Sequence, residues 1–212
     1  MKRIAIIVTT LFVFVVAAAA ETDFERISES CRRLDKDTVL NKINIGFTKE
    51  SPRQILEEDY FSKIKNSFGG SIPISGGWGY TQEDSVIINK DDPSVSQFIP
   101  FDGVGIEYAF IPKRIYEELI IFKPAGQKFN GIRWNQLIQE LLFIEQRSYD
   151  YHRYFVFGYR DKDWEYLKNI YTDNNGFKND PEGLERHLEE NYSLAICYET
   201  DYWFDITSFS GK

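Results

Sequence analysis

Histidine and cysteine, the usual ligands of zinc, are scarce in this chain of 212 residues, which contains two of each. The chain has no His-x₃-His spacing and no Cys-x₂-Cys spacing, so no zinc motif is present. The polar turn at 173–176 does not extend into a calcium loop, because placing Gly176 at the sixth position puts Tyr171 at the first. We therefore expect no metal and no cofactor.

Motifs of catalysis and of nucleotide binding are also missing. No Gly-x-Ser-x-Gly occurs, and the glycines at 76–79 lack the Gly-Lys-Ser/Thr ending of a phosphate loop. Paired carboxylates that hydrolyse a glycoside have no fixed spacing, so the sequence leaves open whether the protein is an enzyme.

Basic residues are outnumbered by acidic ones. The chain has 25 Lys and Arg against 33 Asp and Glu, for a net charge of −8. Nucleic acids and anionic lipids bind through lysine and arginine, so we expect neither nucleic acid nor an anionic membrane surface as a partner.

Long hydrophobic runs are absent except at the start of the chain. Lys2 and Arg3 precede the apolar run Ile4–Val16, and four alanines follow it. This pattern predicts a cleaved signal peptide at 1–20, a single domain at 21–212 and a periplasmic or secreted location without membrane insertion. The alternative is an uncleaved anchor, although Ile4–Ala20 is at the lower end of the length that spans a bilayer.

The two cysteines are Cys31 and Cys197. In an oxidising compartment they can form a disulfide that closes most of the chain into one loop. The alternative is a pair of buried free thiols, since Cys197 lies in an apolar run.

Hydrophobic spacing and capping residues predict an α+β domain with a mostly antiparallel sheet, N-terminal helices and two short helices near the C-terminus. The expected helices cover 22–43, 51–64, 164–171 and 181–191. The expected strands cover 85–89, 105–111, 114–122, 132–145, 149–159 and 194–206.

Three details of this assignment carry alternatives. The segments 114–122 and 132–145 also fit a helix, although 105–122 is favoured as a hairpin turned at Pro112-Lys113. The last segment is either one strand or a hairpin turned near Thr200-Asp201. Asp161 or Asp163 is expected to cap the helix at 164–171.

The glycine-rich segment 75–84 is the candidate binding loop. Its glycines permit unusual backbone conformations, which would present an aromatic platform beside acids and an amide. The candidate binding residues are Trp78, Tyr80, Gln82, Glu83 and Asp84. The alternative is a tight turn whose Trp78 fills the core. A second candidate surface combines Tyr198, Tyr202 and Trp203 with Glu199, Asp201 and Asp205, and its alternative is ordinary sheet packing.

The two histidines are interpreted as surface residues. His152 shares a strand face with Asp150 and Tyr154, and His187 lies on a glutamate-rich helix.

Together these features predict an exported, non-enzymatic binding protein of a bacterial envelope. It would engage a protein partner through an acidic, aromatic-rich surface, as an inhibitor or immunity-type protein does. The alternatives are a cell-wall hydrolase that uses paired carboxylates and a glycan-binding module that uses Trp78 and Tyr80.

Overall fold

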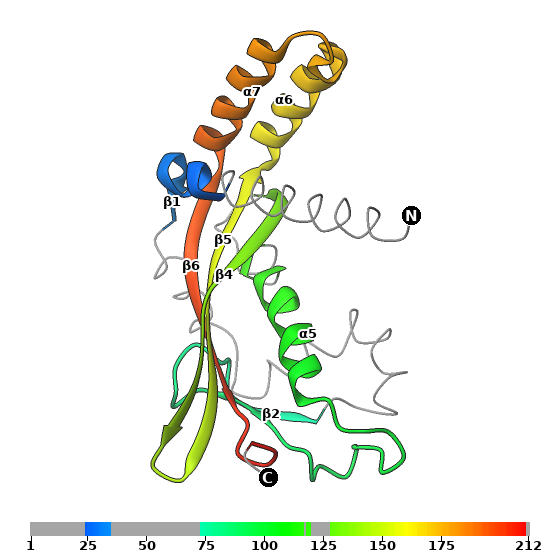
Figure 1. Cartoon of the computed structure of the whole chain (residues 1–212), viewed down its shortest axis with the longest axis vertical. Helices are drawn as coiled ribbons and strands as arrows, with labels where there is room; N and C mark the ends of the chain where they lie inside the picture. The colour runs from blue at the N-terminus through cyan, green and yellow to red at the C-terminus, as the bar shows by residue number, and fades with distance from the viewer. Residues whose placement is uncertain (1–23, 35–72, 117, 120–127, 211–212) are drawn as a thin grey trace, which may run out of the picture.

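The structure is a computed structural model that describes residues 24–34, 73–116, 118–119 and 128–210. The signal-peptide prediction at 1–20 and the helix prediction at 51–64 lie outside these ranges. A twisted sheet runs along the molecule, with helix α5 beside it and the α6–α7 helical hairpin extending from one end (Figure 1). The labelled elements of the sheet are β1 (Arg32–Arg33), β2 (Ile74–Gly76), β3 (Val86–Ile88), β4 (Phe129–Ile144), β5 (Arg147–Arg160) and β6 (Ile196–Asp205). The helices are α5 (Gly103–Tyr116), α6 (Asp161–Asp173), a 3₁₀ turn η3 (Asn175–Phe177) and α7 (Pro181–Leu194).

The sheet has the strand order β2-β3-β6-β5-β4, and β1 pairs with β6 as well. The β2–β3, β4–β5 and β5–β6 pairs are antiparallel, whereas β1 and β3 each run parallel to β6. The longest pair is the β4–β5 hairpin, with strands of 16 and 14 residues. The fold is therefore α+β with a mostly antiparallel sheet, as the sequence predicts.

Each face of the sheet packs on a separate core, because successive side chains of a strand point to opposite faces. On one face, Val156 and Phe204 pack with Phe110 and Ile115 of α5. On the other, Phe155 and Cys197 pack with Ile27 of the residue 24–30 helix and Leu167 of α6. Within the described ranges, no helix combines the length and the hydrophobicity needed to cross a bilayer.

The hairpin predicted at 105–122 is wrong, because the described part of this segment is helical. Residues 103–116 form α5, and Glu118 and Leu119 follow in a π-helical turn. The Asp102 carboxylate accepts a hydrogen bond from the Gly105 N–H at 2.8 Å near the start of the helix. Pro112 lies inside the helix instead of in a turn, at the loss of one backbone hydrogen bond. The helix prevails because it places Ile106 and Phe110 together against the sheet.

The helix predicted at 22–43 is shorter than expected. The described residues 24–30 are helical, and the Cys31 N–H donates to the Ile27 carbonyl at 2.8 Å where the helix ends. The chain then continues as β1 beside β6, which brings Cys31 to Cys197. These cysteines form a disulfide with Cα atoms 6.0 Å apart, as one of the two interpretations expects.

Most of the C-terminal half follows the prediction. The strands expected at 132–145 and 149–159 correspond to β4 and β5, and α6 and α7 cover the two expected helices. The prediction of an aspartate cap for α6 is wrong, because its N-cap residue is Arg160 and no side-chain cap bond forms there. The last segment is one continuous strand, β6, without a turn at Thr200-Asp201.

Candidate functional site

The loop at 75–84 folds tightly on Asp84. The Asp84 carboxylate accepts a hydrogen bond from the Trp78 N–H at 2.9 Å. The Asp84 backbone carbonyl accepts a second one from the Gly79 N–H at 2.6 Å. Gly79 has φ of +88°, which glycine adopts without strain. The Trp78 side chain is buried, and the Arg114 guanidinium carbon lies 4.6 Å from its ring centroid. Trp78 is therefore a core residue, as the alternative interpretation of this loop expects.

Tyr80 points inward as well. It is half-buried, its hydroxyl donates to the Glu118 carboxylate at 2.8 Å, and its ring centroid lies 6.1 Å from that of Tyr202. The structure thus places Tyr80 and Trp78 beneath the loop and not as an aromatic platform on its outside.

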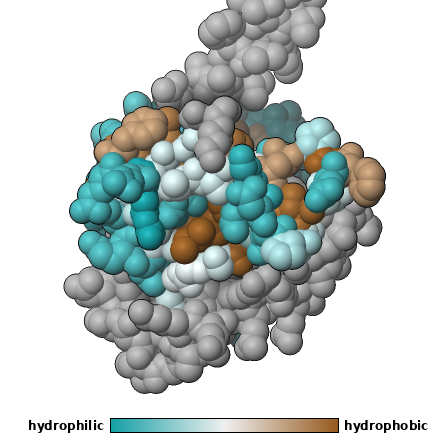
Figure 2. All heavy atoms as spheres, turned by 90° about the horizontal axis from the view of Figure 1, so that it is seen from below, coloured by the Kyte–Doolittle hydropathy of each residue, from teal (hydrophilic) through white to brown (hydrophobic). Residues whose placement is uncertain are grey.

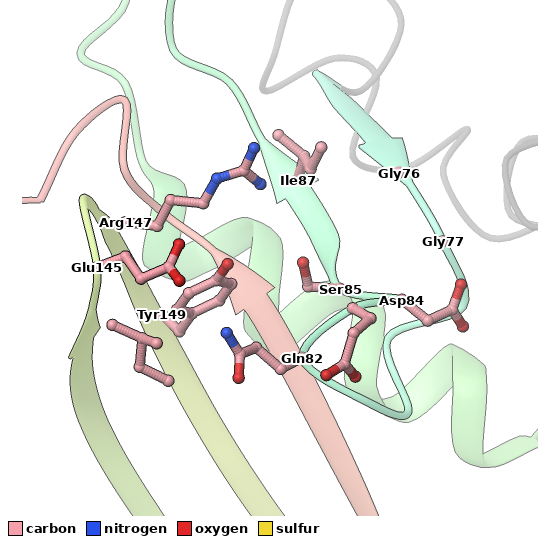
Figure 3. Close-up of a pocket in the computed structure, with 11 residues that line it drawn as sticks. Gly76, Gly77, Gln82, Asp84, Ser85, Ile87, Glu145, Arg147 and Tyr149 are labelled. Carbon is pink, nitrogen blue, oxygen red and sulfur yellow. The ribbon is translucent and has the colours of Figure 1, made fainter.

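The three polar candidates of this loop border an open pocket. Gln82, Glu83 and Asp84 line it on one side, and the turn of the β4–β5 hairpin lines it on the other. Its volume is about 500 Å³. In Figure 3, Glu145, Arg147 and Tyr149 of the hairpin lie across the pocket from Gln82 and Ser85. The structure therefore adds hairpin residues to the site, which the sequence analysis did not foresee because they lie far away along the chain.

The charge around this pocket is acidic. Glu83 and Glu145 are exposed, and Asp84 is half-buried. Arg147 is the single basic residue in the described lining. Its Nη1 lies 3.2 Å from Oδ2 of Asp205, whose side chain is buried, so this ion pair offsets the charge of Arg147. The pocket can accept a cationic group from outside.

Glu145 has a strained backbone. Its φ is +56°, in the left-handed region that disfavours residues with a Cβ atom. It is the first residue of the two-residue turn between β4 and β5, where glycine is the usual choice. The turn therefore tolerates strain while it holds a carboxylate at the pocket.

A buried carboxylate lies between α5 and the sheet. The Glu118 carboxylate accepts hydrogen bonds from the hydroxyls of Tyr198 at 2.6 Å and Tyr202 at 2.8 Å, in addition to the one from Tyr80. Burial raises the pKa of Glu118, although the tyrosine hydroxyls and Arg114 act in the opposite direction. Burial and the Glu118 carboxylate raise the pKa values of Tyr198 and Tyr202 well above the usual value.

This cluster corrects the second surface predicted from the sequence. Tyr198 and Tyr202 are buried against α5, whereas Trp203 lies on the opposite face of the sheet and packs on Tyr151 with ring centroids 4.7 Å apart. Alternation along β6 puts the two tyrosines and Trp203 on different faces, so they do not form one surface.

The prediction that both histidines are solvated is also wrong. His152 is fully buried beneath α5, where its Nε2 lies 3.5 Å from Oε2 of Glu107 and 3.4 Å from Oδ2 of Asp150. His187 is buried as well, because its ring packs on Phe177 at a centroid distance of 5.2 Å. The alternation of β5 correctly puts Asp150 and His152 on one face, but α5 covers that face.

The three groups of the His152 cluster have shifted pKa values. Burial raises the pKa of Glu107 to about 7, with His152 opposing the shift. For His152, burial lowers the pKa, but the two carboxylates outweigh it and raise the value to about 8. Burial acts to raise the pKa of Asp150, but the nearby His152 imidazole and the hydrogen bond from Gln139 hold it below its usual value. The sequence analysis missed Glu107 because it assigned that segment to a strand.

Comparison with protein-family models, with curated proteins and with solved structures finds no match to this chain. Function is therefore inferred from the geometry of the two candidate sites: the open pocket beside the hairpin turn and the buried cluster beneath α5.

Proposed function

We propose that this protein is an exported, non-enzymatic binding protein that receives a lysine or arginine side chain of a protein partner in the pocket beside the β4–β5 turn. The observation that carries the proposal is the acidic lining of that pocket. Glu83 and Glu145 contribute exposed carboxylates, while the charge of Arg147 is offset by Asp205. The two oxygens of a carboxylate match the two N–H groups of a guanidinium, and acidic surfaces also accelerate association with basic partners.

The surroundings of the pocket support a protein as the partner. At the end of the molecule seen from below, hydrophilic side chains surround a smaller hydrophobic area (Figure 2). Close to the hairpin turn, Leu141 and Phe143 of β4 are exposed at 53% and 70%. Protein interfaces combine an apolar centre with a polar rim, so a partner that covers this end would bury both.

Export is supported by the disulfide between Cys31 and Cys197. Disulfides persist in oxidising compartments such as the bacterial periplasm and are rare in the cytosol. This agrees with the pattern of a charged start, an apolar run and four alanines at the beginning of the chain. An inhibitor or immunity-type role fits a protein that needs surface complementarity to a partner in the envelope.

The alternatives have less support from the geometry. A glycan-binding module would use an exposed aromatic platform, but Trp78 is buried and Tyr80 points toward Glu118. A hydrolase would place a water-shielded acid in a cleft that substrate can reach. Four acids are buried among the described residues. Glu107, Glu118 and Asp150 do not line the open pocket, and Asp205 is paired with Arg147.

Site-specific photocrosslinking in the producing cells tests the proposal. A photoreactive amino acid replaces Gln82, an uncharged residue of the pocket lining, in one full-length chain and Glu189, on the remote α7 helix, in a control chain. We expect one envelope protein to be linked at position 82 and not at position 189. Adding Glu145→Lys should abolish the adduct, because a cation then occupies the pocket. Identical adducts at both positions, or none at position 82, would refute the proposal.

A second prediction follows from the strained backbone conformation of Glu145. Glu145→Gly relieves the positive φ and should raise the free energy of unfolding by about 0.5–1 kcal/mol. The same change removes a carboxylate from the pocket and should weaken the crosslink at position 82. Urea unfolding measures the first effect, and Glu145→Asn, which tolerates a positive φ but carries no charge, is the control. A less stable Glu145→Gly variant would contradict the assignment of strain.

A further inference from the structure

The buried cluster beneath α5 brings together three groups that bind metal ions. Glu107 comes from the first half of α5, and Asp150 and His152 come from alternate positions of β5. One ligand atom of each residue lies within 4.8 Å of the other two. These residues are far apart along the chain, which is why no metal-binding spacing appears in the sequence.

The distances within the cluster suit coordination better than hydrogen bonding. The two contacts of His152 Nε2, 3.5 Å to Glu107 and 3.4 Å to Asp150, exceed the roughly 2.7–2.9 Å of a charge-assisted hydrogen bond. A tetrahedral ion with bonds of about 2.0–2.1 Å separates neighbouring ligand atoms by about 3.3 Å. The two distances from His152 Nε2 therefore match the spacing of ligands around one ion, and a carboxylate oxygen of Glu107 lies within 4.8 Å of one of Asp150.

A second, independent observation is the state of the Glu107 carboxylate. Its side chain is 1% exposed, and neither of its oxygens has a hydrogen-bond partner among the described residues. An unsatisfied buried carboxylate strongly destabilises a fold, unless a proton or a cation compensates its charge. Glu107 points at the imidazole nitrogen and at Asp150, so a cation held between them would compensate both acids.

We propose that Glu107, Asp150 and His152 form a binding site for a divalent transition-metal ion of the zinc type, which fastens α5 to the sheet. Two carboxylates and a neutral imidazole carry a charge of −2, which matches the ion. The mixed nitrogen and oxygen donors favour zinc over calcium or magnesium, which prefer oxygen alone.

The cluster has one side that reaches the surface. The exposed Gln139 donates a hydrogen bond from Nε2 to Oδ2 of Asp150 at 2.9 Å, and the Tyr108 hydroxyl donates to Oε1 of Gln139 at 3.3 Å. A water molecule that enters beside these two residues would complete the tetrahedron. The ion can enter from this side without disturbing the core around Phe110.

Metal uptake by the purified protein tests this site. After removal of metal with a chelator, the protein is dialysed against Zn²⁺, and the bound metal is measured by elemental analysis. We expect one ion per chain and a higher melting temperature, because the ion binds the folded state. Replacement by Co²⁺ should give the intense visible absorption of a tetrahedral centre. Failure of the folded protein to bind one equivalent, or a weak octahedral spectrum, would overturn the proposal.

Isosteric variants separate the site from general effects on folding. Glu107→Gln and Asp150→Asn keep the side-chain shapes but remove a ligand charge, so each should weaken Zn²⁺ binding at least about tenfold. Glu118→Gln changes a neighbouring buried carboxylate outside the site and should leave the affinity unchanged. Circular dichroism verifies that all three variants fold. Full affinity in both ligand variants, or an equal loss in the Glu118→Gln control, would also refute the site.

Discussion

Removing the disulfide should destabilise this protein severely. The bond joins Cys31, directly after the residue 24–30 helix, to Cys197 in β6, across a sequence separation of 166. In the chain-entropy description, a loop of this length lowers the entropy of the unfolded chain by an amount worth about 5 kcal/mol at 25 °C. Globular domains have total free energies of unfolding of about 5–15 kcal/mol, so removing the disulfide would remove a large part of the stability.

The structure indicates which region should separate first. The N-terminal segment is attached to the second core by Ile27, by the edge-to-face contact between Phe24 and Phe155 at 4.9 Å and by the short pairing of β1 with β6. A two-residue strand and one short helix bury little surface. Without the disulfide, we therefore expect this segment to open before the sheet unfolds.

The test compares Cys31→Ala with the oxidised and the reduced wild-type protein in urea unfolding. Cys31 is half-buried, whereas Cys197 is fully buried, so the change at Cys31 disturbs packing less. We expect Cys31→Ala and the reduced wild type to unfold at similar, much lower urea concentrations than the oxidised protein. Hydrogen exchange should show early opening at residues 24–33. An unchanged urea midpoint, or two free thiols in the native protein by mass spectrometry, would refute the reasoning.

Two further predictions concern stability. Burial raises the pKa of Glu118, so the folded protein binds a proton more tightly there than the unfolded chain does. Its contribution to stability is therefore present below the usual carboxyl pKa and is lost as the pH rises through the folded-state value. The stability of the wild type relative to Glu118→Gln should fall as the pH rises above the usual carboxyl pKa in chemical unfolding, and a constant difference would contradict the shift. Asp180→Ala should cost about 1 kcal/mol, because the Asp180 carboxylate accepts a hydrogen bond from the Gly183 N–H at 2.8 Å and caps α7. Glu182→Ala, which keeps this cap, is the control, and equal losses in thermal unfolding would rule out the capping contribution.

The regular elements of the C-terminal half were predictable because their signals are local. Alternating aromatic residues at 149–159 identify β5, and Asp180 with Pro181 identifies the start of α7. Such patterns reflect the period of a strand or the unsatisfied amides at a helix end, which depend on residues a few positions apart. The fold class follows from the order of these elements.

The segment that became α5 shows where local patterns stop being informative. Its apolar residues fit both periods, and Pro112-Lys113 resembles a turn. The helix covers one face of the sheet, and that face is built from strands as far away along the chain as β6. The wrong assignment there hid Glu107 and made His152 seem exposed.

Composition and short-range patterns, taken alone, specify the chain's acidity, its sheet-forming segments, its capped helix and the availability of two cysteines for pairing. The packing of distant segments decides whether those cysteines meet. It also decides which face α5 covers and which acids surround the pocket. Glu145 lines the same pocket as Glu83, and Glu107 lies beside His152, because segments far apart along the chain pack together. Both candidate sites lie between such segments, since a binding site needs groups that converge in space and not along the chain.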